Sequence, residues 1–527
     1  MEGREELVRF VEKPGRKFLF HCGEQFLWER LPVGTRVVYP PPPLPPLPDV
    51  EQAVEEAIEH PLEDDPLSAQ LRPGMKVTIA FDDLSLPLPP VPTHRDPRKV
   101  ILEKVVEKCA EKGVEDIHLI AALGVHRRMT PQEIRERVGD KIFQAFFPHR
   151  LYNHDAEDPQ GNVLLGTTDQ GEEVWLNRRV AESDLLIYVN INLSSMDGGH
   201  KSINTGLTTY RTLRHHHNVH TLMNCRSYMD PSNSHLHTVL ERMGRVVAQH
   251  VKSFHIETTL NSATFPRLYG FLEKPEDFWS PKDAASFHGV RCSLDAMPFK
   301  MRWRIWQSQR APYGVTSVQA GQVDAVHART LENLFRQQVV PVKGQSDIVI
   351  AGTPYLCPYN VNSFLNPILV WVLMLGYGFN MYLGAPLVRR GGVLIYTHPL
   401  SPRFHREHHP SYIDFYEKVL TETRDPAAIE RREEEFASHE GYRRQFREGY
   451  AYHGVHPFYM WYWGLYGAAW AGKVIFVPGH PEVAERLGVD TAPTVAEAIE
   501  KAKEVVGPSP SITYYHWPPI FLCQVTP

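Results

Sequence analysis

Residues 183–202 read SDLLIYVNINLSSMDGGHKS and join a strand to a glycine turn that ends in a lysine. The apolar run 183–193 predicts a strand buried on both faces, as the strands of parallel sheets are. Gly198 and Gly199 lack a Cβ, so backbone N–H groups can approach a ligand there. Because ligands of parallel sheets bind beyond the carboxyl ends of the strands, this turn is a candidate site.

The preceding sequence alternates strands with helices. MKVTIAF (75–81) predicts a buried strand that ends at Asp82-Asp83, and VEDIHLIAALG (114–124) predicts a second one. Residues 97–113 have apolar positions at helical spacing and end in glycine, a helix stop signal. Thr130-Pro131-Gln132-Glu133 opens a further helix with a capping box. This alternation predicts a parallel sheet with helices on both faces.

A second α/β run begins near residue 311, and 527 residues are too many for one hydrophobic core. We therefore expect an α/β protein of two domains with mainly parallel sheets and an active-site crevice between them. The expected parts are an N-terminal extension with a proline-rich strap (1–74), an N-terminal α/β domain with a histidine-rich site (75–310), a C-terminal α/β domain (311–505) and a C-terminal tail (506–527).

Composition argues against several classes of protein. The net charge of −6 disfavours nucleic acid as a partner. The six cysteines stand far apart without a Cys-x-x-Cys pair, which predicts reduced thiols and a cytoplasmic location. The first ten residues carry charges where a signal peptide is apolar. The apolar stretch 368–383 is shorter than the ~20 residues that span a bilayer, so we expect a buried helix and no membrane partner.

Histidines concentrate between Gly198 and His255. Imidazole is the commonest neutral metal ligand near physiological pH, so the segment predicts a metal or metallocofactor site. His215-His216-His217 cannot all face one ion, and any single histidine is more often a surface or core residue. We take His200, His216 and His217 as the candidate metal ligands. The nine histidines of the segment are His200, His215, His216, His217, His220, His235, His237, His250 and His255.

Other polar residues follow the predicted strands. His126 lies at a strand's carboxyl end beside a capped helix and is a candidate general acid/base. His154, between Asn153 and Asp155, is a second candidate, although a turn is the commoner role. The turn 197–202 has His-Lys-Ser where a phosphate loop has Gly-Lys-Ser, so a nucleotide triphosphatase is disfavoured. Lys201 is instead an anion contact or a nucleophilic amine that can hold a cofactor.

These pieces stand in the order seen in the lactate racemase (LarA-like) family, which the chain resembles from about residue 75 to 370. Asp83-Leu84-Ser85-Leu86-Pro87-Leu88-Pro89 is similar to the family's Asp-x-Thr-Arg-Pro-x-Pro. The remaining likenesses are Gly124, His126, Arg127 and Thr130; Gly198-Gly199-His200-Lys201; His217-Asn218; Ala320-Gly321 with Ala325 and His327; and the strand and turn at 346–362.

The resemblance implies a two-domain α/β racemase or epimerase of 2-hydroxyacids that uses a nickel-pincer nucleotide. It implies that Lys201 contacts or holds this cofactor and that His217 ligates nickel. His126 would take the proton of the substrate hydroxyl. The cofactor-binding residues expected on this basis are Asp83, Ser85, Gly198, Gly199 and Lys201.

The chain also departs from the family pattern. Leu86 replaces an arginine, and Asn190, Ile191 and Asn192 stand where a second catalytic histidine belongs. Leu365 and Ile368 replace a glutamine and a lysine. An asparagine does not titrate and cannot serve as the second base.

Two functions therefore remain open. The first is a LarA-like racemase or epimerase of a small-molecule 2-hydroxyacid other than lactate. The second is a cofactor-free paralogue that binds a bare zinc or nickel ion through the histidines, with a different activity or none. The sequence leaves a homo-oligomer open.

Overall fold

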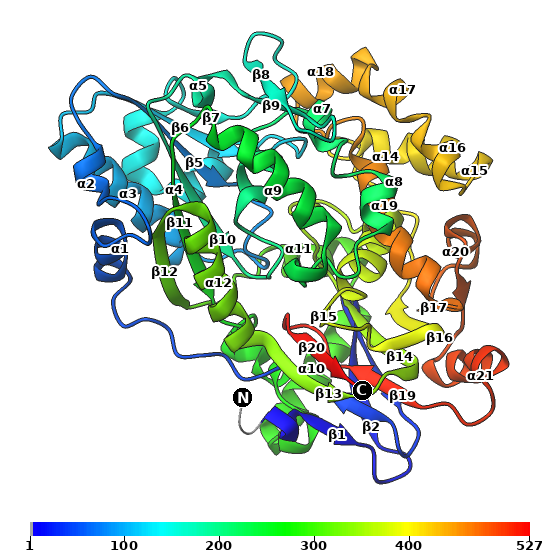
Figure 1. The fold of residues 1–527 in the computed structure, drawn as a ribbon. Coiled ribbons are helices and arrows are strands. Elements are labelled where there is room, and N and C mark those ends of the chain that lie inside the picture. Colours follow the sequence, from blue (N-terminus) through cyan, green and yellow to red (C-terminus); the bar gives the residue numbers. More distant parts are fainter. Residues whose placement is uncertain (1–3) are drawn as a thin grey trace.

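The chain, a computed structural model that describes residues 4–527, is built on two large sheets, at the upper left and lower right of Figure 1. The first has the strand order β12-β11-β10-β5-β6-β7, and only β12 runs antiparallel to its neighbour. The expected α/β fold with mainly parallel sheets is confirmed. The strands are β5 (Lys76–Asp82), β6 (Asp116–Ala122), β7 (Leu151–Asn153), β10 (Leu185–Asn192), β11 (Ser253–Leu260) and β12 (Val315–Gly321).

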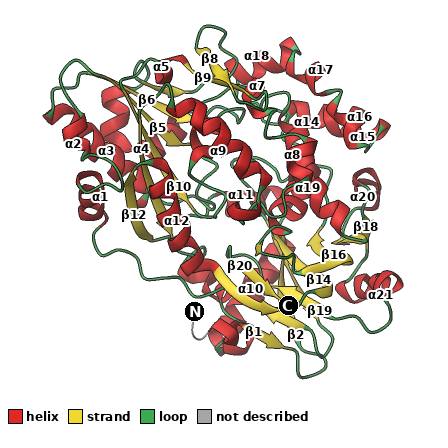
Figure 2. Cartoon of the chain, in the orientation of Figure 1, coloured by secondary structure: helices red, strands yellow, loops and turns green. Residues whose placement is uncertain are grey.

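Strand β10 shows why this sheet forms, because all eight of its residues are buried. Ile187 and Val189 pack with the core between the sheet and α3 and α4, whereas Leu186 and Tyr188 pack on the opposite face with α6 and α9. Helices thus cover both faces (Figure 2). The helices of this half are α1 (Val50–Glu59), α2 (Leu67–Gln70), α3 (Pro97–Glu111), α4 (Pro131–Phe146), α5 (Arg178–Ala181), α6 (His200–Gly206), α7 (Tyr210–Leu213), α8 (Val219–Met223), α9 (His235–Ala248) and α12 (Val323–Gln338).

The second sheet takes strands from both ends of the chain. Strand β14 lies at its centre, between β19 and β16, and also pairs with β2 from the N-terminal segment. The path β1-β4-β19-β14-β16-β17-β18 is completed by the β2–β3 hairpin. The strands are β1 (Val8–Phe10), β2 (Lys17–Gly23), β3 (Gln25–Arg30), β4 (Arg36–Val38), β14 (Ser346–Pro354), β16 (Val388–His398), β17 (Lys473–Pro478), β18 (Asp490–Thr491) and β19 (Ile512–Tyr515).

This topology differs from the expected division of the chain. Residues 8–38, assigned above to an extension, supply four strands to the second sheet, and the tail 506–527 supplies β19. The tail also supplies β20 (Leu522–Thr526) to a separate three-stranded sheet with β13 (Val339–Lys343) and β15 (Tyr382–Leu383). Strand β12, assigned to the second domain, pairs with β11 in the first sheet. Short-range patterns do not reveal such pairings because the partner strands lie hundreds of residues apart. The first three residues of the expected extension lie outside the described residues.

The apolar stretch 368–383 is buried in the core of the second half, as expected. It forms α13 (Pro367–Trp371) and the π-helix Val372–Gly378, which packs against α19 (His456–Trp470). No helix within residues 4–527 is long and apolar enough to cross a membrane. The charged region 410–448 forms a series of short helices. The other helices are α10 (Pro281–Ala296), α11 (Phe299–Gln307), α14 (Pro410–Asp414), α15 (Leu420–Glu422), α16 (Pro426–Glu430), α17 (Glu433–Ala437), α18 (Glu440–Glu448), α20 (Pro481–Leu487) and α21 (Val495–Val506).

The N-terminal strands should be required for stability. Phe20 of β2 is fully buried against Ile350 and Tyr514 of the second sheet. We expect Phe20→Ala to lower the free energy of unfolding by about 3–5 kcal/mol, measured by urea denaturation. Phe10→Ala is the matched control, since Phe10 is 59% exposed and its loss should change stability by less than about 0.5 kcal/mol. Equal, small effects of both changes would mean that this segment is a dispensable extension.

Candidate active site between the two sheets

A pocket of about 110 Å³ lies between the two halves of the chain, at the carboxyl ends of β5, β6 and β10. This is where parallel sheets place ligands. Six residues expected from the sequence line it: Asp83, Ser85, His126, Gly198, Lys201 and His217. Residues far apart in the sequence thus meet at one crevice, with the second domain closing it from the other side.

His126 is oriented by a buried carboxylate. Its Nδ1 lies 2.9 Å from Oδ2 of Asp83, whose other oxygen accepts hydrogen bonds from the backbone N–H and the hydroxyl of Ser85. Burial would raise the pKa of Asp83, but the imidazole and the Ser85 hydrogen bonds outweigh it and lower that pKa. The Nε2 atom of His126 has no hydrogen-bond partner within residues 4–527, so it is free to exchange a proton with a ligand.

Asp82, the last residue of β5, is a second carboxyl group on the pocket wall. It accepts hydrogen bonds from the Asn190 side chain at 3.0 Å and from the Ile191 N–H at 2.7 Å. Burial raises the pKa of Asp82 to about 7. The asparagine in the region of the missing second histidine therefore contacts a group that titrates near neutrality.

A buried ion pair between Glu257 and His327 holds the glycine turn in place. Gly198 and Gly199 have φ angles of +89° and +59°, which L side chains rarely adopt. The Gly199 N–H donates to Oε1 of Glu257 at 2.7 Å, and Oε2 of Glu257 lies 3.2 Å from Nδ1 of His327. Burial opposes a charged imidazole, yet the Glu257 carboxylate outweighs it and raises the pKa of His327. A Cβ at Gly199 would lie 2.8 Å from the His327 ring, so the turn requires glycine for packing.

Lys201 follows this turn at the start of α6 and is, among residues 4–527, the only lysine or arginine that lines the pocket. Its Nζ lies 3.8 Å from Oδ1 of Asp197, whose other oxygen caps the backbone at Ser194. The amine is therefore fixed at the pocket wall, while 21% of its side chain stays exposed.

Hydrogen bonding determines which nitrogen of His217 faces the pocket. Nε2 of His216 lies 3.2 Å from the carbonyl oxygen of Asn204, so this nitrogen carries the proton and donates it. Nδ1 of His216 is then an acceptor, and Nδ1–H of His217 donates to it at 2.8 Å. The lone pair of His217 Nε2 remains free. Burial lowers the pKa of His217 well below its ordinary value, so the imidazole stays neutral, as a metal ligand must be.

Four residues assigned to the site from sequence do not line the pocket. Both ring nitrogens of His154 are engaged in the core, with the Thr208 carbonyl oxygen and the Asn177 amide. His200 points away, with its Nε2 3.0 Å from Asp324 and its ring against Gly244. His216 uses both nitrogens to orient His217, so it is a positioning residue and not a ligand. Gly199 does not line the pocket either, although it shapes the turn.

The second domain contributes residues that the sequence analysis missed. Tyr359 and Tyr377 line the pocket and share a hydrogen bond of 2.8 Å between their hydroxyl groups, and Trp463 lies 5.4 Å from the His217 ring. Tyr359 lies in the turn of the 346–362 likeness, but it was not singled out as a site residue. The resemblance ended near residue 370, before Tyr377 and Trp463, so only contact between the domains identifies these two.

Comparison with known proteins identifies one domain of the chain. Residues 30–230 match the family model of the lactate racemase N-terminal domain. This part of the chain is therefore a lactate racemase N-terminal domain. The domain supplies the aspartate, histidine and lysine side chains of the pocket, so the match covers the residues on which the geometry depends.

The fold of the whole chain agrees with this family. The lactate racemase apoprotein from Thermoanaerobacterium thermosaccharolyticum aligns with a TM-score of 0.61 and 16% identity, over 96% of this chain and 100% of that one. A Thermotoga maritima protein aligns with a TM-score of 0.48 and 13% identity, over 90% of this chain and 97% of that one, and is too distant to argue from. No curated protein sequence matches the chain.

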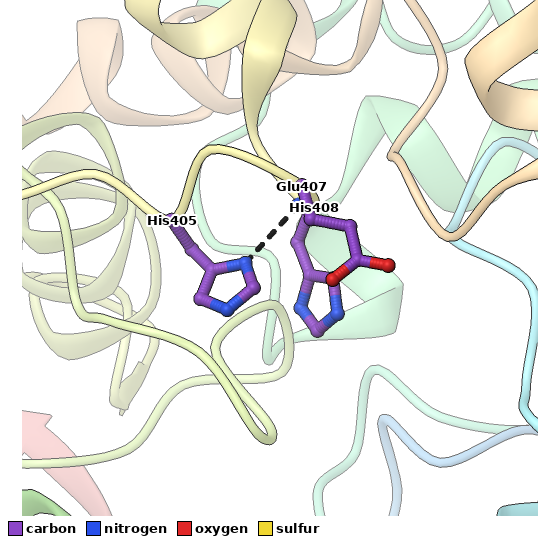
Figure 3. Close-up of side chains that lie close together, drawn as sticks. All are labelled: His405, Glu407 and His408. Atoms are coloured by element: carbon purple, nitrogen blue, oxygen red, sulfur yellow. Dashed lines mark hydrogen bonds between the residues drawn. The ribbon is translucent and has the colours of Figure 1, made fainter.

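A second group of metal-ligating side chains lies outside the lactate racemase pocket. His405, Glu407 and His408 each place one donor atom within 4.8 Å of the others, in the loop before α14 (Figure 3). Burial lowers the pKa of His408 to about 2, so this imidazole is neutral. Nδ1 of His405 already accepts the His408 backbone N–H at 3.2 Å, and a metal at that atom would have to displace it.

The buried carboxyl of Asp82 predicts a pH-dependent stability. Its folded pKa is raised to about 7, so its protonated form stabilises the fold at low pH and this contribution is lost as the pH rises to 7. The amide that replaces this carboxyl in Asp82→Asn does not titrate. We therefore expect the variant to gain on the wild type by up to ~1.4 kcal/mol per pH unit between pH 5 and 7, and no further above pH 7.5. Urea unfolding across this range measures the difference.

Asp169→Asn is the control for this series, because the Asp169 side chain is 76% exposed. Its stability relative to the wild type should not vary with pH. A pH-independent difference for Asp82→Asn as well would contradict a protonated, buried Asp82.

Proposed function

We propose that this chain is a racemase or epimerase of a small-molecule 2-hydroxyacid other than lactate, and that it works with a nickel-pincer nucleotide. The observation that carries the proposal is the convergence of His126, Lys201 and His217 on one pocket between the domains. Each of these residues matches a family motif, and each presents the group that its proposed role needs. The match of residues 30–230 to the lactate racemase N-terminal domain supports the same reaction class.

The donor set fits the metal-bearing part of this cofactor. His217 presents a neutral imidazole with a free Nε2 lone pair, and imidazole suits nickel. Lys201 supplies an amine on the same wall, where it would hold or contact the cofactor. The phosphate end of the cofactor has fewer partners, since Leu86 replaces the family's arginine. Among the described residues, Lys201 is the only lysine or arginine in the lining.

When bound, the nickel-pincer nucleotide supplies a hydride acceptor. His126 takes the proton of the substrate hydroxyl through its free Nε2, because Asp83 fixes the ring by its Nδ1. The hydrogen-bonded hydroxyls of Tyr359 and Tyr377 orient the polar end of the substrate. Pro358 and Trp463 of the second domain add apolar surface to the lining.

A racemase needs a proton acceptor for each enantiomer, and Asp82 is our candidate for the second one. It lines the pocket, and its raised pKa of about 7 lets it gain and lose a proton near neutrality. Neither His154 nor His200 reaches the pocket, so neither replaces the missing histidine. Burial raises the pKa of the Tyr359 hydroxyl, which therefore stays protonated near neutrality and does not act as a base.

The loss of His126 should greatly reduce turnover, whereas the loss of His154 should not. With the cofactor-loaded protein, we expect His126→Ala to reduce kcat by ~10²–10⁴-fold, since that is the usual contribution of a general acid/base. His154→Ala should stay within about threefold of the wild type per folded molecule, because it does not line the pocket. Chiral chromatography of 2-hydroxyacid enantiomers measures the rates, and circular dichroism measures the folded fraction. Full activity in His126→Ala would refute the assignment.

A cofactor-free, metal-binding role is the second candidate function. The observation that favours it is the group His405, Glu407 and His408, which offers two nitrogens and a carboxylate to zinc or nickel. In this case the metal would lie away from the lactate racemase pocket. The backbone hydrogen bond to His405 makes this the weaker site.

Elemental analysis of the zinc- or nickel-loaded chain, without the pincer nucleotide, separates the two candidates. A bare-metal site predicts about one equivalent of metal that is lost in His405→Ala and in His408→Ala. The control is His215→Ala, since His215 lines an open surface hollow away from this loop. Metal content that is unchanged in both loop variants would exclude the second candidate.

A further inference from the structure

A second cavity adjoins the candidate active site. It has a volume of about 120 Å³ and lies beyond the carboxyl ends of β5, β10, β11, β14 and β19, so both sheets contribute to it. Most of its walls are apolar; the lining residues with polar groups are Ser194, Asp197, Thr264, Tyr355, Cys357, Tyr377 and Trp517. The two cavities share the wall residues Leu86, Met196, Asp197, Pro358 and Tyr377 and are therefore neighbours across this boundary.

We propose that the apolar cavity holds the side chain of the substrate, and that the substrate is a 2-hydroxyacid with an apolar side chain of several carbon atoms. This inference rests on the proposed function. The polar end of such a molecule would lie beside His126 and Lys201 in the first cavity, and its side chain would cross the shared wall at Leu86 into the second.

The residues at the boundary explain this choice of substrate. Leu86 stands where the family has an arginine, and it lines both cavities. A guanidinium there would bring a charge into a space lined by Leu88, Met229 and Leu373, which is costly without a partner. Leucine instead makes the passage between the cavities apolar. A methyl group, as in lactate, would leave the second cavity empty, and its walls would gain nothing from binding.

The two other family positions do not reach the cavities. Leu365 and Ile368, which replace a glutamine and a lysine, are buried in the core of the second domain at 6% and 0% exposure and line neither cavity. The apolar surface of the second cavity therefore comes from its own walls. An apolar side chain on the substrate is the chemistry that these walls recognise.

Binding of a chain-length series to the purified full-length protein tests the inference by isothermal titration calorimetry. The probes are lactate, 2-hydroxybutanoate and 2-hydroxyhexanoate, with hexanoate as a control that lacks the hydroxyl. Each buried methylene contributes about 0.8 kcal/mol, which is roughly a fourfold change in Kd. We expect 2-hydroxyhexanoate to bind on the order of 50-fold more tightly than lactate. Equal affinities would overturn the inference, as would hexanoate binding as tightly as 2-hydroxyhexanoate.

Substitutions in the cavity walls test whether the second cavity binds the side chain of the substrate. Leu86→Arg should abolish the dependence on chain length, because it places a longer, charged side chain at the boundary between the cavities. Leu88→Trp, which fills the second cavity from a half-buried position, should weaken 2-hydroxyhexanoate at least tenfold and leave lactate unchanged. Leu164→Arg is the control, since Leu164 is 42% exposed and lies in β8 (Asn162–Thr167), away from both cavities. Chain-length dependence that survives in both cavity variants would overturn the proposal.

Failure of this inference and failure of the proposed function give different results. Tight, chain-length-dependent binding without racemisation of any probe by the cofactor-loaded protein would refute the function and keep the binding site. Racemisation with no preference for longer side chains would keep the function and refute the site.

Discussion

The hydrogen bond from the Gly199 N–H to the buried carboxylate of Glu257 is the contact on which the site depends. It holds two consecutive residues at positive φ and so sets where α6 begins. Helix α6 in turn carries Lys201 into the pocket and presents the Asn204 carbonyl oxygen to His216. Because His216 then orients His217, one buried carboxylate positions both the amine and the imidazole that we assign to the cofactor.

Local sequence patterns predicted the strands and helices around the site, but not the pairings between distant parts of the chain. The strands β5, β6 and β10 and the capped helix α4 arise from local patterns, and they were predicted with their polar ends. Asp83, His126 and Lys201 follow those strands directly, so the predicted sheet brought them together. The strands of residues 8–38 could not be predicted to join the second sheet, because their partners β14 and β19 lie more than 300 residues away.

The histidine-rich segment shows the limit of composition as a guide. Three of its members, His200, His216 and His217, looked equivalent as ligands, but hydrogen bonds to Asp324 and to the Asn204 carbonyl oxygen leave a free lone pair in the pocket only on His217. His154 was predicted as a base, and the core bonds both of its nitrogens. Such partners come from distant elements, so spacing alone cannot assign the role of a histidine.

We infer that His217 is the metal ligand of the pocket between the two sheets, and that His216 orients it. Nickel-edge X-ray absorption of the protein loaded with the nickel-pincer nucleotide tests this most directly. If His217 is the ligand, we expect about one nickel per chain with a single imidazole ligand. The imidazole signal should be lost in His217→Ala. In His216→Ala, nickel should be retained with a more disordered imidazole shell, because the ring loses its hydrogen-bond acceptor. An unchanged imidazole signal in His217→Ala, or one that disappears only in His405→Ala or His408→Ala, would contradict the account.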